Sequence, residues 1–326
     1  MRFLVTGGAG FIGSHLAEAL LRRGKKVRVV DNLSTGARQN LEQLKSVDGD
    51  LDIIEADLND ADAARRACAG IEIAFHLAAL PSVARSVEFP ITSNAANVTA
   101  TVELLSAARA AGIRRIIYAA SSSAYGERSA DGRSPAGRDR VVVKRETMAP
   151  RPLSPYAVSK LAGEYYTQVF HDVYGVETVC LRYFNIFGPR QNPFSAYGAA
   201  IPKFILAMLR DEPPVIFGDG KQSRDFTYIE NAVEANLLAA EAPKKLVSGE
   251  VFNVACGRNA TLLDVIDTLN RLLGKKITPK FAAARLGDVR HSKADIAKAK
   301  RLLGYEVRVP LAEGLERTVA WLRDRV

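Results

Sequence analysis

The sequence predicts an α/β protein in which a doubly wound parallel sheet is followed by a smaller mixed α/β lobe. Over the first two-thirds of the chain, short apolar runs rich in β-branched residues alternate with helix-like stretches, the order of a parallel sheet with helices on both faces. The runs are largely apolar rather than alternating, as expected of strands buried on both faces. Near residue 187 this alternation gives way to loops rich in Gly, Pro, Asn and Gln.

The predicted elements follow from the same pattern. Strands are expected at residues 2–6, 26–30, 51–55, 72–76, 114–119 and 177–181. Helices are expected between most of them, with examples at residues 11–23, 95–111 and 155–174. We therefore expect one domain over residues 1–186 and a second lobe over residues 187–326, with some of the later elements free to return to the main sheet.

The composition is that of an ordinary globular protein, with 48% hydrophobic and 25% charged residues. No apolar run approaches the length of a transmembrane helix, and the chain opens directly into a strand, which leaves no room for a signal peptide. Cys68, Cys180 and Cys256 lie far apart without a CxxC spacing. We therefore expect buried, reduced thiols and a cytoplasmic protein. No set of metal ligands is predicted.

The net charge of +9 invites a nucleic-acid partner. The Lys and Arg residues are spread along the chain, however, and form no run interleaved with aromatic residues. We predict no nucleic-acid and no membrane partner, and note that a positive potential also suits a doubly anionic small molecule. The polar segment 127–144, with Arg128, Arg133, Arg138 and Arg140, is interpreted as a solvated surface loop.

A glycine-rich turn follows the first predicted strand and opens the first helix. Gly7, Gly10 and Gly13 permit a tight turn, close approach of the backbone to a pyrophosphate, and close helix–strand packing. The helix N-terminus supplies unpaired N–H groups and a partial positive charge for the phosphates. This context predicts a Rossmann-like dinucleotide site, in which Phe11 and Ile12 belong to the same turn.

The ends of the next strands carry residues suited to the rest of a dinucleotide. Asp31 follows the second strand, where a carboxylate accepts hydrogen bonds from the adenosine ribose diol and repels a 2′-phosphate. NAD is therefore predicted over NADP, and Arg38 is the only local hint of the opposite preference. Asp57 and Leu58 follow the third strand, at a place from which they reach the adenine.

The end of the fourth predicted strand is expected to form a wall of the same site. Leu77, Ala78 and Ala79 offer mostly small side chains beneath a flat cofactor. His76 directly precedes them, and we interpret it as a packed, hydrogen-bonded core residue rather than a catalyst.

Tyr156 and Lys160 are the predicted catalytic pair. Ser154 is a good helix N-cap and Pro155 suits the first helical position, so Tyr156 and Lys160 lie on one face of the helix that follows. A tyrosine must ionise to act as a base, and its usual pKa of about 10 is too high near neutral pH. A nearby ammonium, a cationic nicotinamide and the helix N-terminus all favour the phenolate.

Ser121, Ser122 and Ser123 end the fifth predicted strand, at the sheet edge where ligands bind in such folds. A hydroxyl there can hydrogen-bond a sugar hydroxyl that is being oxidised and relay its proton.

In this order the motifs resemble the extended short-chain dehydrogenases that epimerise nucleotide sugars, and most of all the bacterial UDP-N-acetylglucosamine 4-epimerases. The resemblance runs almost the whole length, through GGAGFIGSHL at 7–16, DNLSTG at 31–36, HLAALPSVARSV at 76–87, SSSAYG at 121–126, PLSPYAVSK at 152–160, LRYFNIFGPRQ at 181–191, GDGKQSRDFTYIEN at 218–231 and GDVRHSKAD at 287–295. It implies an NAD-dependent isomerase whose first domain binds NAD and whose second lobe mainly binds a UDP-sugar.

The resemblance also implies roles for individual residues. Tyr156 is the expected base, Lys160 its electrostatic partner and a ligand of the nicotinamide ribose, and Ser121 the first choice of hydroxyl, followed by Ser122 and Ser123. Further cofactor contacts are expected at Asn32, Ser34, Gly36, Asn97 and Phe184. Substrate contacts are expected at Ser82, Arg85, Ser121, Ser123, Tyr156, Asn185, Ala200 and Phe217, with Arg224 and Arg285 on the diphosphate and Asp288 on the uridine ribose.

Ser292 is the position on which the expected sugar depends. By resemblance, relatives restricted to unacetylated glucose and galactose carry a tyrosine there, whereas a serine leaves space for an N-acetyl group at carbon 2. The chain departs from the family pattern in a long insertion between Tyr125 and Tyr156. We therefore expect UDP-N-acetylglucosamine and UDP-N-acetylgalactosamine, together with UDP-glucose and UDP-galactose, as substrates.

Other activities remain open to different degrees. A 4,6-dehydratase is disfavoured, because that family places an Asp-Glu pair where this chain has Ser122 and Ser123. A UDP-glucuronate decarboxylase is disfavoured too, because it carries a glutamate in this stretch, and this chain has none there. A UDP-glucuronate 4-epimerase is the main alternative, because Arg190 or a loop arginine could pair with a 6-carboxylate. A catalytically silent NAD-dependent sensor is disfavoured, because such proteins commonly lose the tyrosine or the lysine, and this chain keeps both Tyr156 and Lys160.

The oligomeric state is predicted from the resemblance alone. The apolar helices at 95–111 and 155–174 could form the four-helix interface of a homodimer. The same apolar faces could equally be covered within one chain.

Overall fold

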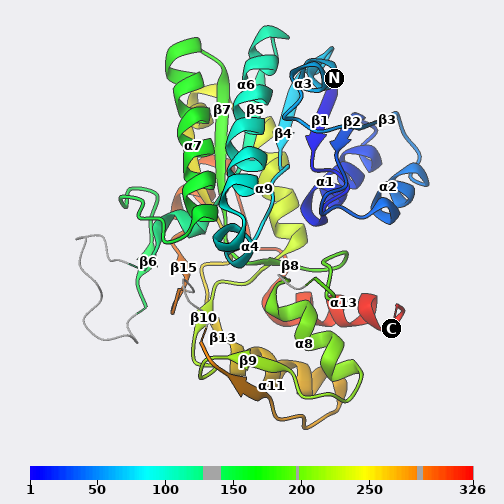
Figure 1. Ribbon diagram of the computed structural model, residues 1–326, viewed down its shortest axis with the longest axis vertical. Helices are drawn as coiled ribbons and strands as arrows, with labels where there is room; N and C mark the ends of the chain where they lie inside the picture. Colours follow the sequence, from blue (N-terminus) through cyan, green and yellow to red (C-terminus); the bar gives the residue numbers. More distant parts are fainter. Residues whose placement is uncertain (128–140, 196–197, 285–288, 326) are drawn as a thin grey trace.

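A seven-stranded parallel sheet forms the larger part of the molecule, as the sequence predicts (Figure 1). The computed structural model describes residues 1–127, 141–195, 198–284 and 289–325. The strand order is β12-β7-β5-β4-β1-β2-β3. The strands are β1 (Arg2–Thr6), β2 (Lys26–Asp31), β3 (Leu51–Glu55), β4 (Ile73–His76), β5 (Arg115–Ser121), β7 (Glu177–Tyr183) and β12 (Glu250–Val254).

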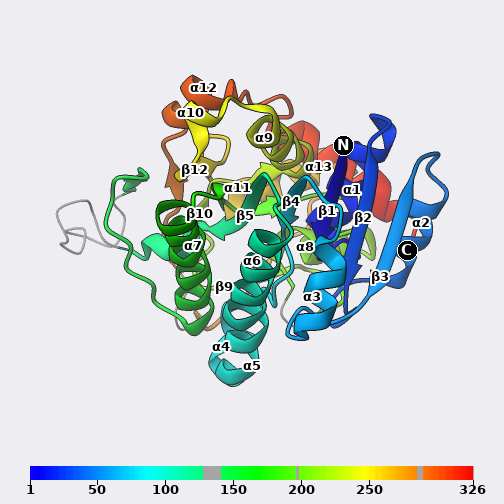
Figure 2. The same ribbon diagram turned by 90° about the horizontal axis from the view of Figure 1, so that it is seen from above.

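Helices cover both faces of this sheet (Figure 2). One face carries α3 (Ala61–Cys68), α6 (Ala100–Ala110) and α7 (Pro155–Tyr174). The other carries α1 (Phe11–Arg22) and α9 (Ile229–Glu241), which pack on one another. The remaining helices of this part are α2 (Arg38–Lys45), α4 (Val83–Glu88), α5 (Pro90–Asn94), α10 (Lys244–Val247) and α12 (Ala297–Leu303). Within the described residues, no helix is both long enough and apolar enough to cross a membrane.

The smaller lobe lies below the sheet in Figure 1 and is built on three helices that pack together. These are α8 (Ala200–Leu209), α11 (Leu262–Leu273) and α13 (Leu311–Arg323). Short strand pairs accompany them: β9 (Val215–Phe217) with β14 (Lys280–Ala282), β10 (Ser223–Arg224) with β13 (Ala260–Thr261), and β8 (Ile186–Phe187) with β11 (Thr227–Tyr228). β6 (Val143–Lys144) pairs with β15 (Lys293–Ala294).

The chain beyond residue 187 also contributes to the main sheet. β12 pairs in parallel with β7, Val251 opposite Cys180, and α9 packs on the same sheet. The predicted domain boundary at residues 186 and 187 stays a prediction, with β12 as an element from beyond it that joins the sheet.

The predicted strands are confirmed with small changes at their ends, and the helix predicted at residues 95–111 is confirmed with a π-helical first turn. Residues 95–111 form a π-helix over Ala95–Thr99 followed by α6, rather than one regular α-helix. The π-helical turn contains the buried Asn97, whose side-chain amide makes two hydrogen bonds. It accepts from Leu80 N at 2.7 Å and donates to Ser159 Oγ at 3.0 Å. An apolar pattern cannot reveal such a turn, because the partners lie far away along the chain.

The predicted helix α7 is confirmed from Pro155 to Tyr174, together with its caps. The Ser154 hydroxyl accepts from Ala157 N at 3.2 Å. Gly175 ends the helix in the left-handed conformation, with φ of 71°, a position that glycine adopts without steric cost.

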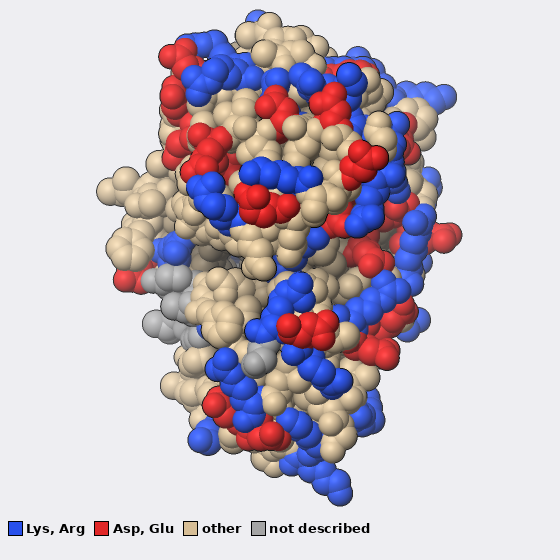
Figure 3. All heavy atoms as spheres, turned by 90° about the vertical axis from the view of Figure 1, so that its right-hand side faces the viewer, with Lys and Arg blue, Asp and Glu red and all other residues tan. Residues whose placement is uncertain are grey.

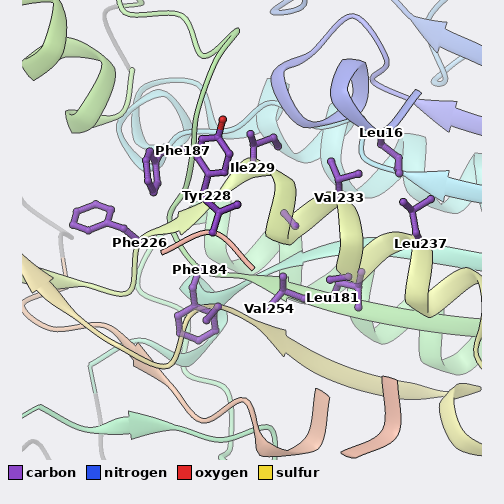
Figure 4. Close-up of a cluster of buried hydrophobic side chains, with 14 of the residues drawn as sticks. Leu16, Leu181, Phe184, Phe187, Phe226, Tyr228, Ile229, Val233, Leu237 and Val254 are labelled. Carbon is purple, nitrogen blue, oxygen red and sulfur yellow. The ribbon is translucent and has the colours of Figure 1, made fainter. Parts of the chain in front are cut away.

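The main core lies between α9 and the sheet and continues into the smaller lobe (Figure 4). Val233 and Leu237 of α9 face Leu16 of α1 and Leu181 of β7. At the lobe end of the same cluster, the aromatic rings of Phe187, Phe226 and Tyr228 pack on one another. The two parts therefore share one core. The thiols of Cys68 and Cys180 are buried as predicted, whereas Cys256 is only half-buried.

Candidate active site

The glycine-rich turn forms a cradle that side chains would fill. Gly7 has φ of 69°, and Gly10 N donates to Gly7 O at 3.0 Å. A Cβ added at Gly13 would lie 2.2 Å from Gly7 O, so only glycine lets the helix approach the turn so closely. Gly10, the N-cap of α1, has no side chain, and no side-chain hydrogen bond caps this helix end among the described residues. The turn therefore fits the pyrophosphate of a dinucleotide.

Asp31 is held at the carboxyl end of β2 by two backbone groups. Its carboxylate accepts from Ala9 N at 2.9 Å and from Leu33 N at 2.8 Å. Burial raises the pKa of this carboxyl, and the two backbone hydrogen bonds oppose that rise. Gly36 closes over it, since a Cβ there would lie 3.0 Å from Asp31 Oδ1. The carboxylate is thus fixed in orientation, as a ribose-binding group must be.

Arg38, the one residue that suggested a 2′-phosphate site, is paired with a carboxylate in the structure. Arg38 donates to both carboxylate oxygens of Glu55, at 2.9 Å each. Nearby, Asn32 donates to Asp57 at 2.9 Å. The Arg38 guanidinium is therefore already paired with a carboxylate of the same protein, which supports NAD over NADP.

The first and fourth strands meet closely at the wall of the site. Thr6 Oγ1 accepts from Leu77 N at 3.2 Å and Ala78 N at 3.1 Å, and bonds His76 Nδ1 at 2.8 Å. His76 Nε2 bonds Thr101 Oγ1 at 2.9 Å. His76 is therefore the hydrogen-bonded core residue that the sequence predicts.

Two buried histidines make a testable contribution to acid stability. Burial, aided by the Lys160 charge, lowers the pKa of His76 from 6.5 to about 3, and burial beside Arg190 lowers that of His15 to about 4. The unfolded chain takes up these protons near pH 6.5 and the folded protein does not. The free energy of unfolding should therefore fall as the pH drops below about 6.5, by up to about 1.4 kcal/mol per pH unit for each histidine.

Urea denaturation over a series of pH values checks this expectation. A His15→Gln/His76→Gln double variant should lose free energy of unfolding less steeply on acidification. An unchanged slope in that variant would assign the acid sensitivity to other groups.

Tyr156, Lys160 and Ser121 come together at the carboxyl end of β5. A side-chain hydrogen bond between Ser121 and the Tyr156 hydroxyl opposes the rise that burial causes in the pKa of Tyr156. Lys160 is 4% exposed, and its Nζ lies 4.4 Å from the centre of the Tyr118 ring. Burial lowers the pKa of Lys160 to about 7, against the attraction of the Glu164 carboxylate.

The serine cluster is ordered around Ser121. Ser121 Oγ accepts from Ser123 N at 3.2 Å and from Ser123 Oγ at 2.9 Å. Ser122 begins the short 3₁₀ turn that follows β5. Ser121 therefore links the tyrosine hydroxyl to a second hydroxyl, as a proton relay requires.

Three of the predicted substrate residues lie in short strands or directly before them. Ser292 N donates to Ser223 O at 3.0 Å, which places it beside β10. Arg224 lies on the same strand and donates to the carbonyls of Ser223 and Arg290. Asn185, with φ of 40°, donates to Asp225 O at 3.4 Å. Arg285 and Asp288 lie outside the described residues.

The other predicted contact residues lie at the ends of helices and strands or in the core. Ser82 is the N-cap of α4, with φ of 133°, and accepts from Arg85 N at 3.2 Å. Ala200 is the first residue of α8, and Phe217 ends β9 with 37% of its surface exposed. The Phe184 side chain is buried against the Tyr125 ring, with 6.1 Å between ring centroids.

Arg190, which the sequence suggested as a partner of a sugar carboxylate, pairs with a carboxylate of the same protein. Its guanidinium is paired with Glu18 of α1, and its side chain is 12% exposed. On the face of the molecule shown in Figure 3, acidic and basic groups lie interleaved in this way. The suggestion that Arg190 binds a 6-carboxylate stays a prediction. Its pairing with Glu18 could not be foreseen, since a local pattern cannot show a partner so distant in sequence.

Sequence reasoning missed two residues beside Ser292. Arg290 donates to both carboxylate oxygens of Asp219, at 2.8 Å each, and so ties the loop before β15 to the loop after β9. His291 Nδ1 lies 2.8 Å from Ser223 Oγ. Both residues belong to the GDVRHSKAD segment that carries the family resemblance. That segment does not show that their partners are Asp219 and Ser223.

Comparison with known proteins agrees with this geometry. The NAD dependent epimerase/dehydratase family matches residues 3–255. A UDP-glucose 4-epimerase of Mycolicibacterium smegmatis is 36% identical, over 100% of this chain and 99% of its own. The UDP-N-acetylglucosamine 4-epimerase of Methanobrevibacter ruminantium, solved with UDP-N-acetylmuramic acid, is 39% identical with a TM-score of 0.90, over 100% of this chain and 99% of that one.

A third relative is the UDP-glucuronic acid 4-epimerase of Bacillus cereus, solved with UDP-glucuronic acid and NAD. It is 35% identical with a TM-score of 0.89, over 100% of both chains. These full-length matches confirm the predicted cofactor, NAD, and the predicted enzyme class, an NAD-dependent isomerase. The chain belongs to the NAD dependent epimerase/dehydratase family, among its nucleotide-sugar 4-epimerases.

Proposed function

We propose that this enzyme inverts carbon 4 of UDP-hexoses, both the N-acetylated pair and the glucose and galactose pair. The observation that carries the proposal is the Ser121–Tyr156 hydrogen bond at the carboxyl edge of β5, with Lys160 buried one helical turn from Tyr156. A base, a relay hydroxyl and a cation in this arrangement suit the oxidation of a secondary alcohol.

The proposed mechanism assigns a step to each residue. Ser121 hydrogen-bonds the 4-hydroxyl and relays its proton to the Tyr156 phenolate, which acts as the base. Lys160 stabilises the phenolate by its charge. NAD, when bound at the glycine turn and Asp31, would supply the acceptor and then the donor of the carbon 4 hydride. Between the two transfers the 4-keto sugar turns about its diphosphate linkage, so that its opposite face is reduced.

Arg224 is proposed to hold the diphosphate during this rotation, because a guanidinium forks well onto phosphate oxygens. Arg285 and Asp288 are proposed as its partners at the diphosphate and the uridine ribose by resemblance. The cofactor contacts expected from the sequence, Asn97 among them, are also proposed here. In the described structure the Asn97 amide is bonded to Leu80 and Ser159.

The substrate range is proposed from two observations. Ser292 is a small residue beside β10, and by the family resemblance it faces the carbon 2 substituent of the sugar. Arg190, one candidate partner for a 6-carboxylate, is paired with Glu18. Both support a hexose. A UDP-glucuronate 4-epimerase is the second candidate, because the Bacillus cereus relative that acts on a uronate covers the whole chain.

Separate incubations with UDP-glucose, UDP-N-acetylglucosamine and UDP-glucuronate, followed by proton NMR without added cofactor, test the proposal. We expect the 4-epimer in the first two. Conversion of glucuronate alone would preserve the mechanism and overturn the substrate assignment. No epimer in any sample, even after NAD is supplied, would favour a silent binding protein.

A substitution at Ser292 tests the sugar specificity. Ser292→Tyr should lower kcat/KM for the acetylated sugar on the order of tenfold or more, because the ring occupies the N-acetyl space, and should leave UDP-glucose turnover nearly unchanged. Ser292→Ala, which stays small, is the matched control. An equal loss for both sugars in the tyrosine variant would mean that Ser292 does not face the carbon 2 substituent.

A homodimer is also proposed. An apolar stripe is exposed along α7, formed by Val158, Tyr166, Val169 and Val173. Exposed apolar patches of this kind often mark a protein–protein interface. A second copy packing against α6 and α7 would cover it. Sedimentation at micromolar protein should show a dimer that a Val169→Glu/Val173→Glu variant loses.

A further inference from the structure

The peptide groups of Tyr156 are held by two serine hydroxyls. Ser86 Oγ accepts from Tyr156 N at 2.9 Å, across 70 residues of sequence. Ser159 Oγ donates to Tyr156 O at 2.8 Å. The backbone of Tyr156 is therefore held both before and after its α-carbon.

Ser86 is itself firmly placed. It lies on α4, which packs against the lower end of α7 (Figure 1), and it is fully buried. Its hydroxyl also donates to Val83 O at 2.7 Å, which leaves the oxygen lone pairs directed at Tyr156 N. A buried hydroxyl with both roles satisfied holds its rotamer tightly.

A second path connects the same stretch of chain to Tyr156. Asn97 accepts from Leu80 N at 2.7 Å and donates to Ser159 Oγ at 3.0 Å, and Ser159 in turn holds the Tyr156 carbonyl. The segment that runs from Leu80 to Ser86 thus reaches Tyr156 from two sides. This segment follows directly on the proposed cofactor wall at Ala78 and Ala79.

The helix cannot supply these bonds itself. Tyr156 lies in the first turn of α7, where backbone N–H groups have no partner within the helix. Ser154 satisfies the N–H of Ala157, so Ser86 is needed for that of Tyr156. Without it, the first turn can shift and carry the phenol away from Ser121.

We propose that Ser86 is a positioning residue, which acts through the backbone of Tyr156 to hold the phenol in register with Ser121 and the reacting carbon. The inference rests on the proposed role of Tyr156 as the base. Ser86 touches neither substrate nor cofactor in this scheme, so its loss slows the chemical step and leaves substrate affinity unchanged.

The test compares Ser86→Ala with three variants. Ser86→Thr keeps the hydroxyl, Ser154→Ala removes the other hydroxyl cap of the same turn, and Ser93→Ala removes a buried hydroxyl of α5 whose oxygen has no hydrogen-bond partner among the described residues. Ser86→Ala should lower kcat between about tenfold and a hundredfold, the size expected when a reacting group is misplaced. KM should stay within about twofold, Ser86→Thr should restore most of kcat, and Ser93→Ala should match the parent protein.

A measurement without turnover accompanies these kinetics. The ionisation of Tyr156 is followed by the ultraviolet absorbance of tyrosinate, as the difference between each protein and its Tyr156→Phe counterpart. Loss of the Ser121 hydrogen bond should move this titration to higher pH in Ser86→Ala, because that bond lowers the pKa of Tyr156. Urea denaturation reports the loss of stability in Ser86→Ala and Ser154→Ala.

The outcomes separate the inference from the proposed function. If Tyr156→Phe keeps full activity, the proposed base is wrong. If Tyr156→Phe is inactive but Ser86→Ala has the kcat and the titration of the parent protein, the base stands and Ser86 has no positioning role. Equal losses of kcat and stability in Ser86→Ala and Ser154→Ala would reduce Ser86 to an ordinary helix cap.

Discussion

Tyr156→Phe is expected to lower kcat for epimerisation by between about a hundredfold and ten-thousandfold, the range for removal of a general base. The phenylalanine keeps the ring and its packing in α7 and removes only the hydroxyl that bonds Ser121. The free energy of unfolding should therefore stay close to that of the parent protein. Proton NMR of the 4-epimer, together with urea denaturation, measures both quantities.

Tyr165→Phe is the matched control for this substitution. Tyr165 lies on the same helix and is 49% exposed, so loss of its hydroxyl should leave kcat unchanged. A Tyr156→Phe variant with more than about a tenth of the parent kcat would exclude Tyr156 as the essential base.

Arg182→Met is expected to reduce the free energy of unfolding by about 3–5 kcal/mol, because it leaves the Glu164 carboxylate buried without its counter-charge. Arg182 donates to both Glu164 oxygens, at 2.8 Å and 2.6 Å, and the two side chains are 4% and 1% exposed. The guanidinium also stacks on the Tyr125 ring, 4.5 Å from its centroid. Urea denaturation at neutral pH gives the loss.

A double-mutant cycle separates the ion pair from packing. Glu164→Gln/Arg182→Met carries no charge at either position of the pair, and we expect it to recover most of the stability that Arg182→Met loses. A loss below about 1 kcal/mol in the single variant would mean that water reaches the pair, as at surface salt bridges.

The sequence by itself determined the local features of this protein. β1 and β3 lie at their predicted residues, and α7 runs from Pro155 to Tyr174 as predicted. The glycine turn at Gly7 and the helix cap at Ser154 were also predicted from the sequence and are found in the structure. All of these depend on interactions within a few residues, namely the burial of strands on both faces, glycine torsion angles and first-turn hydrogen bonds.

The tertiary structure alone decided which partner each charged or polar side chain takes. Arg38 pairs with Glu55, Arg190 with Glu18, and Ser86 with the backbone of Tyr156. These pairs join segments far apart along the chain, so no local pattern records them. Sheet order and helix packing bring the groups together, and the cost of burying a polar group alone then fixes the pairing.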